Sequence, residues 1–149
     1  MEIQVLKLAI SEQDLNDLIP ELLGPNQQVK DLRIRVSPEG VQISGIYQLM
    51  IGVHFDALWR PAIWDGGLLA ISLADFKVVG FGGSMLKGAV MSALGDLAAQ
   101  KEGVHVDGDT LVIEPDHIML RKGLPVKTNL TAVYCDTGWV VVEGGSPAE

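Results

Sequence analysis

The side chains that could do acid–base or metal chemistry are few and lie on separate segments. The histidines are His54, His105 and His117, and none has the H-x-x-x-H or H-E-x-x-H spacing of a helical zinc site. His54 and Asp56 fall on the polar face of an alternating segment, where solvated side chains are expected. Glu114–His117 combines two acids with an imidazole, so this loop is the place where an enzymatic role would be sought. We expect no catalytic residues, no metal and no cofactor.

Two other motifs also fail to identify a site. Asp107-Gly108-Asp109 resembles part of a calcium loop but lacks the further oxygen ligands, so it predicts a tight hairpin turn. Gly80–Ser84 lacks the Lys-Ser/Thr pair of a phosphate-binding loop and predicts a strand-to-helix corner. Cys135 is the only cysteine, which excludes an internal disulfide. Its place in an alternating strand predicts a buried thiol.

Composition limits the class of partner. The 149 residues include 19 acidic and 11 basic ones, giving a net charge of −8 without a basic cluster. We therefore expect no nucleic-acid binding and no electrostatic adhesion to an anionic membrane. Residues 1–149 are expected to form a single domain with a disordered tail at 144–149. The sequence has no transmembrane segment, and Lys7 interrupts the N-terminal apolar run, so we expect a cytoplasmic protein, or an extracytoplasmic one if a leader was removed.

Alternating apolar residues predict several strands. From Val41 to Trp59 every odd position is apolar or glycine, a period typical of a half-buried strand. Such a strand would run about 60 Å, so it must curve or break without losing phase. Residues 29–59 are predicted to form an antiparallel hairpin, with Arg33 and Arg35 on the polar face of its first strand. The apolar phase slips after Leu73, which predicts a β-bulge near Ala74-Asp75.

Two helices complete the predicted fold. Ser11 is a suitable N-cap for a short amphipathic helix at about 12–23, which contains Pro20. A long helix is expected at about 84–101, with an apolar stripe and a second stripe of small residues. Further hairpins are expected at 104–113 and 126–142. The predicted class is α+β: a long, highly curved antiparallel sheet wrapped around one long helix.

The order of segments resembles a known family. The helix sequence at Ser11–Leu18 is followed by strands, a turn at Asp65–Leu69, a strand-to-helix step at 83–97 and Gly108–Ile113. This layout is similar to the TULIP-like (tubular lipid-binding) superfamily, in particular its small bacterial relatives. It covers most of residues 2–143 as a pattern of spacing with little identity. Two features depart from the family pattern: the absence of a leader or anchor, and two glycines in the long helix. The resemblance implies a lipid tunnel between sheet and helix, and no catalytic residues.

We expect non-enzymatic binding of a lipid or other hydrophobic ligand in an apolar groove between the curved sheet and the helix. The expected lining residues are Ile51, Val53, Phe55, Leu69, Ile71, Met85, Ala89 and Leu94. The alternative is a β-rich protein–protein interaction or assembly module with a filled core. In that case Ile46, Met50 and Leu58 would lie in an interface, as in a homodimer.

Overall fold

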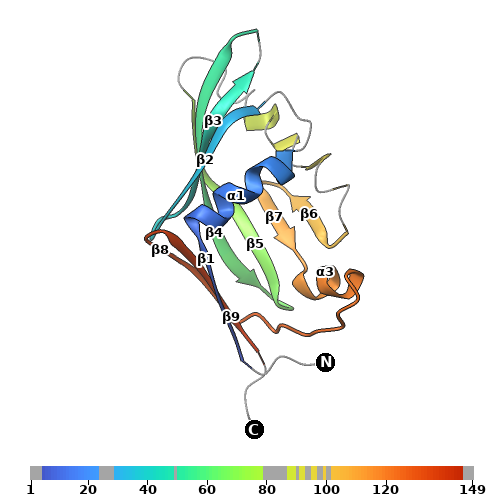
Figure 1. Cartoon of the computed structure of the whole chain (residues 1–149). Helices are drawn as coiled ribbons and strands as arrows, with labels where there is room; N and C mark the ends of the chain where they lie inside the picture. Colours follow the sequence, from blue (N-terminus) through green and yellow to red (C-terminus); the bar gives the residue numbers. More distant parts are fainter. Residues whose placement is uncertain are drawn as a thin grey trace.

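The computed structural model describes residues 5–23, 29–48, 50–78, 87–89, 91–92, 95–96, 99 and 102–145, which form two antiparallel sheets (Figure 1). The larger sheet has the order β2-β3-β4-β5-β7-β6, and the smaller has the order β1-β9-β8. The strands are β1 (Leu6–Ser11), β2 (Val29–Ser37), β3 (Gly40–Gln48), β4 (Gly52–Trp64), β5 (Leu68–Val78), β6 (Val104–Asp107), β7 (Thr110–Ile113), β8 (Ala132–Asp136) and β9 (Trp139–Gly144). The helices with assigned bounds are short: α1 (Glu12–Leu23) and α3 (Pro115–Arg121).

The predicted fold class is wrong. The described residues are mostly β, and they contain no long helix packed against a curved sheet. Within 84–101 only residues 87–89, 91–92, 95–96 and 99 are described, and their backbone is helical. The C-terminal strands do not extend the large sheet, because β9 pairs with β1 on one side and β8 on the other. This pairing forms a second, three-stranded sheet that local sequence patterns did not predict.

The alternating row from Val41 to Trp59 breaks without losing phase. It forms β3 and β4, which pair as a hairpin with Tyr47 opposite Val53 and Gly45 opposite Phe55. Odd-numbered residues of both strands therefore share one face of the sheet. The predicted bulge in β5 is confirmed: Leu58 pairs with Asp75 and Trp59 with Leu73, which leaves Ala74 without a partner residue.

The odd-numbered face of β3 and β4 carries much of the core. Tyr47 and Phe55 are buried, and the ring of Phe55 stacks on Phe76 with centroids 6.0 Å apart. Ala89 packs against the cluster of these two residues, so it lies on this face. Farther along β4, Ala57 and Trp59 are buried, and β8 crosses β2, β3 and β4.

The short N-terminal helix is present as predicted, and it begins with a reciprocal cap. The hydroxyl of Ser11 accepts a hydrogen bond from the Asp14 N–H (3.0 Å), and the Asp14 carboxylate accepts one from the Ser11 N–H (3.2 Å). This is a capping box with aspartate in place of the usual glutamate. It fixes the point where β1 ends and α1 begins.

Side chains of α1 cover the backbone edge of β2. The Asn16 amide donates to the Ile34 carbonyl (2.9 Å) and accepts from the Ile34 N–H (2.8 Å). The Glu12 carboxylate accepts from the Val36 N–H (2.8 Å), and the Gly138 N–H donates to the Val36 carbonyl (2.8 Å). Satisfied edge groups cannot template another strand, so this half of β2 is closed to strand addition.

The predicted hairpin at 104–113 is confirmed, with Val104 opposite Ile113 and Val106 opposite Leu111. The predicted strand at 126–134 is wrong in its first half, because β8 begins only at Ala132. Val126, Thr128 and Leu130 are nevertheless buried in alternation. The carboxylate of Asp116 holds the middle of this segment, since it accepts hydrogen bonds from the Thr128 N–H (2.8 Å) and hydroxyl (2.6 Å).

The C-terminal end of β9 differs from the predicted tail at 144–149. Gly144 belongs to β9, and the N–H of Gly145 donates to the Thr128 carbonyl (2.7 Å). Residues 146–149 lie outside the described residues, as does the predicted corner at 80–84.

Candidate functional site

One face of four neighbouring strands is entirely apolar. β4, β5, β7 and β6 lie side by side in the large sheet (Figure 1). Their register places apolar side chains in two rows that run across all four strands. We call these eight residues the apolar face: Ile63, Leu69, Ile113 and Val104 in the first row, and Pro61, Ile71, Leu111 and Val106 in the second.

The apolar face is only partly covered. Each of its eight side chains is half-buried. On the opposite face of the same strands, Ala70 and Val112 are completely buried. Alternation along β5 and β7 explains why the two sets point in opposite directions. The apolar face therefore keeps exposed hydrophobic area that a ligand could remove from water.

The predicted lining residues fall into separate places. Val53, Phe55 and Ala89 come together in the buried cluster around Tyr47. Leu69 and Ile71 belong to the apolar face. Ile51 is 68% exposed beside the β3–β4 turn, away from both groups. Met85 and Leu94 lie outside the described residues.

Sequence reasoning missed six members of the apolar face. The alternation at 104–106 and 111–113 was visible and predicted the β6–β7 hairpin. No local signal, however, showed that β7 pairs with β5 and so places Leu111 beside Ile71. Pro61 and Ile63 lie beyond the predicted hairpin at 29–59, whereas β4 continues to Trp64.

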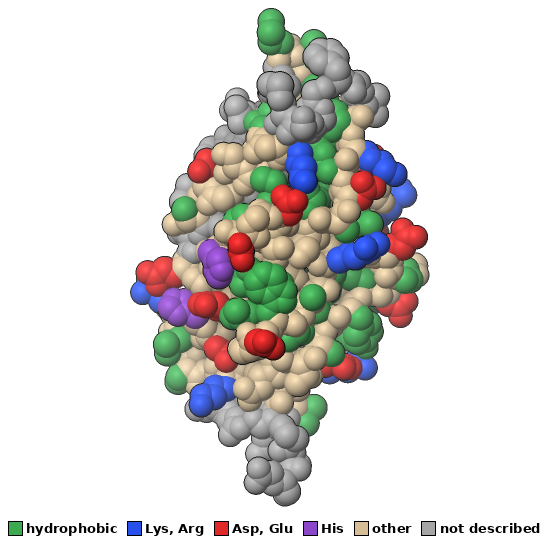
Figure 2. Space-filling model, turned by 180° about the vertical axis from the view of Figure 1, so that it is seen from behind, with side chains coloured by type: hydrophobic (Ala, Val, Ile, Leu, Met, Phe, Trp, Pro, Cys, Tyr) green, Lys and Arg blue, Asp and Glu red, His purple; other side chains and the backbone are tan. Residues whose placement is uncertain are grey.

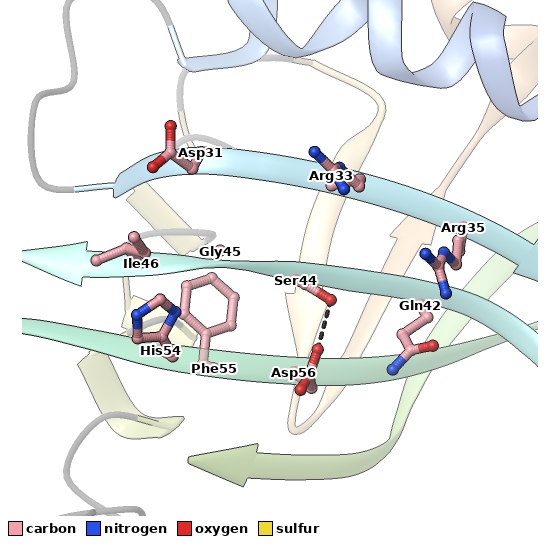
Figure 3. Close-up of a pocket in the computed structure, with 10 residues that line it drawn as sticks. All are labelled: Asp31, Arg33, Arg35, Gln42, Ser44, Gly45, Ile46, His54, Phe55 and Asp56. Atoms are coloured by element: carbon pink, nitrogen blue, oxygen red, sulfur yellow. Dashed lines mark hydrogen bonds between the residues drawn. The ribbon is translucent and has the colours of Figure 1, made fainter. Parts of the chain in front are cut away.

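A polar hollow lies on the other face of the large sheet. It has a volume of about 410 Å³, and Figure 3 shows the residues that line it. The Ser44 hydroxyl donates a hydrogen bond to the Asp56 carboxylate across β3 and β4. The lining residues are Asp31, Arg33, Arg35, Gln42, Ser44, Gly45, Ile46, His54, Phe55 and Asp56.

Comparison with known proteins leaves the family open. No family model, curated protein or solved structure matches this chain. The similarity to tubular lipid-binding proteins therefore stays a prediction.

The Glu114–His117 segment does not form a common site. Asp116 is bound to Thr128, whereas the imidazole of His117 lies 3.5 Å from the Glu102 carboxylate. Arg121 contacts that same carboxylate at 2.9 Å. Among the described residues, no group of three or more His, Cys, Asp or Glu side chains could hold a metal ion.

Neither Cys135 nor the surface charges identify a catalytic site in the described part of the chain. Burial raises the pKa of the Cys135 thiol, which disfavours the reactive thiolate. On the face shown in Figure 2, Lys and Arg side chains are scattered among acidic ones. In the described part of the chain, no helix is long and apolar enough to cross a membrane.

Proposed function

We propose that this protein binds a lipid or another hydrophobic ligand without chemical conversion, and that the apolar face holds the ligand. The observation that carries the proposal is the pair of apolar rows across β4, β5, β7 and β6, each member of which is half-buried. The TULIP-like resemblance of Ser11–Leu18 and Asp65–Leu69 favours the same class of ligand, although the fold predicted with it is wrong.

The energetics favour a long acyl chain over a short one. Burying each methylene contributes about 0.8 kcal/mol, so about 14 methylenes contribute about 11 kcal/mol. Loss of translational and rotational freedom opposes this by at least about 4 kcal/mol. At most ~7 kcal/mol remains, which corresponds to a Kd no tighter than roughly 10 µM.

A fluorescence titration tests the proposal. We expect cis-parinaric acid, a naturally fluorescent fatty acid, to bind saturably with a Kd of roughly 10 µM or weaker. Palmitate should displace it, and octanoate should compete much more weakly because it buries fewer methylenes. Failure of palmitate to displace the probe, or equal competition by octanoate, would contradict burial of an acyl chain.

A protein–protein interface is the second candidate, and the β3–β4 turn favours it. Met50 is fully exposed and its neighbour Ile51 is 68% exposed, whereas Ile46 and Leu58 are half-buried. Adjacent exposed apolar side chains at a hairpin end are typical of contacts with another molecule. The titration separates the two candidates, because an interface formed by this turn predicts no saturable fatty-acid binding.

A further inference from the structure

The polar hollow contains two arginines without a partner in the described structure. Arg33 and Arg35 are both exposed and occupy successive positions on one face of β2, with Cα atoms about 6.5 Å apart. Neither guanidinium forms a hydrogen bond or ion pair with a described residue. Figure 3 shows both side chains at the β2 side of the hollow.

Two acids, Asp31 and Asp56, line the hollow together with the arginines. Asp56, two strands away, accepts a hydrogen bond from the Ser44 hydroxyl, and Ser44 pairs with Arg33 in the β2–β3 register. The hydroxyl thus holds the carboxylate at β4 and leaves the arginine donors available. Gln42, which pairs with Arg35, adds an amide that can donate a hydrogen bond on the same side.

We propose that this hollow binds a phosphate monoester. One carboxylate occupies one guanidinium fork, whereas a phosphate has three terminal oxygens and can accept from both arginines. Its charge of about −1.5 to −2 at neutral pH matches the two guanidinium charges. The carboxylates of Asp31 and Asp56 repel an anion, so the phosphate lies over Arg33, Arg35 and Gln42.

The hollow also has room for the organic part of such a ligand. Its volume of about 410 Å³ is far larger than the roughly 10–15 Å³ that a cavity needs to hold one water molecule. Ile46 and His54 line the part nearest the β3–β4 turn and provide an apolar side chain and an imidazole ring. The site does not depend on the proposed function, because it lies on the face of β4 opposite the apolar face.

Phenyl phosphate is the probe that tests the site, and benzoate is its carboxylate counterpart. In an NMR titration of the ¹⁵N-labelled full chain, we expect saturable shifts of the Arg33, Arg35 and Gln42 amides at roughly millimolar phenyl phosphate. Benzoate should bind at least about tenfold more weakly, because it cannot engage both guanidinium groups. Equal affinity for the two probes would overturn the assignment to phosphate.

A matched set of variants separates a specific site from general attraction. The double variant R33Q/R35Q should weaken phenyl phosphate binding at least about tenfold, and each single variant by a smaller factor. Arg60 lies on the same face of β4, but its Nε donates to the Glu39 carbonyl (3.1 Å), so R60Q should change affinity less than about twofold. Equal losses in R60Q and the double variant, or no loss in either, would overturn the proposal.

A third arm identifies the source of the phosphate. Phosphatidylcholine vesicles with added phosphatidic acid present the same group on a membrane. Co-sedimentation that requires Arg33 and Arg35 would assign the site to a lipid headgroup. Phenyl phosphate binding without co-sedimentation would assign it to a soluble phosphate ester.

Discussion

Val106→Asp weakens the binding of cis-parinaric acid at least about tenfold, which is ~1.4 kcal/mol of binding free energy. Val106 is half-buried at the end of the second apolar row, beside Leu111. A carboxylate at this position must either lose water against the acyl chain or keep the chain away from the row. Among the described strands β6 has one neighbour, β7, and it lies at the end of the sheet order, so the substitution leaves the centre of the sheet intact. The Kd is measured by fluorescence titration.

His105→Asp is the matched control. His105 precedes Val106 on the same strand but is exposed on the opposite face. The His105→Asp variant therefore places a carboxylate on the same strand as Val106→Asp does, but not on the apolar face. We expect its Kd to stay within about twofold of the wild type, because an exposed carboxylate on the opposite face keeps its water and does not meet the acyl chain. Equal weakening by both variants would mean that the apolar face does not hold the ligand.

Phe55→Ala lowers the free energy of unfolding by about 3–5 kcal/mol. Phe55 is 5% exposed, stacks on Phe76 and packs with Tyr47 in the cluster that Ala89 also contacts. Its removal therefore leaves a cavity between β4, β5 and Ala89. The measurement is urea denaturation followed by circular dichroism.

Tyr134→Ala serves as the reference for the loss of an aromatic side chain outside the core. Tyr134 is 43% exposed on β8, so its truncation should cost clearly less than that of Phe55, about 1 kcal/mol or below. Similar losses for the two variants would show that the Tyr47–Phe55 cluster is not a principal part of the core.

Local patterns in the sequence predicted those features that depend on neighbouring residues. The α1 cap at Ser11, the β6–β7 hairpin and the bulge at Ala74 each arise from interactions within a few residues or from strict alternation. The same holds for the phase of the Val41–Trp59 row, which survives the turn because β3 and β4 pair in register.

Long-range pairing could not be inferred in the same way. β9 pairs with β1, more than a hundred residues earlier in the chain, and this pairing makes a second sheet instead of a single curved one. The segment around Thr128 alternates like a strand, but Asp116 holds it by side-chain hydrogen bonds. A period of two in the sequence indicates that one side of a segment is buried. It does not distinguish a segment paired in a sheet from one held by side-chain hydrogen bonds.

In the candidate sites, too, single residues could be predicted from local patterns, but their neighbours on other strands could not. Leu69 and Ile71 were identified from alternation in β5, but their neighbours on β7 and β6 became visible only through the strand order. Arg33 and Arg35 were assigned to the polar face of β2, and their hollow emerged once Gln42, Ser44 and Asp56 were placed beside them.

The most direct test of ligand binding at the apolar face is an isotope-filtered NOE experiment. Palmitate is added to protein labelled with ¹³C in its Ile, Leu and Val methyl groups. We predict NOEs from the acyl methylenes to Ile71, Leu111 and Ile113, whose side chains share the apolar face. A saturated complex that shows NOEs only to Ile51 or to other residues outside the two rows would contradict the account.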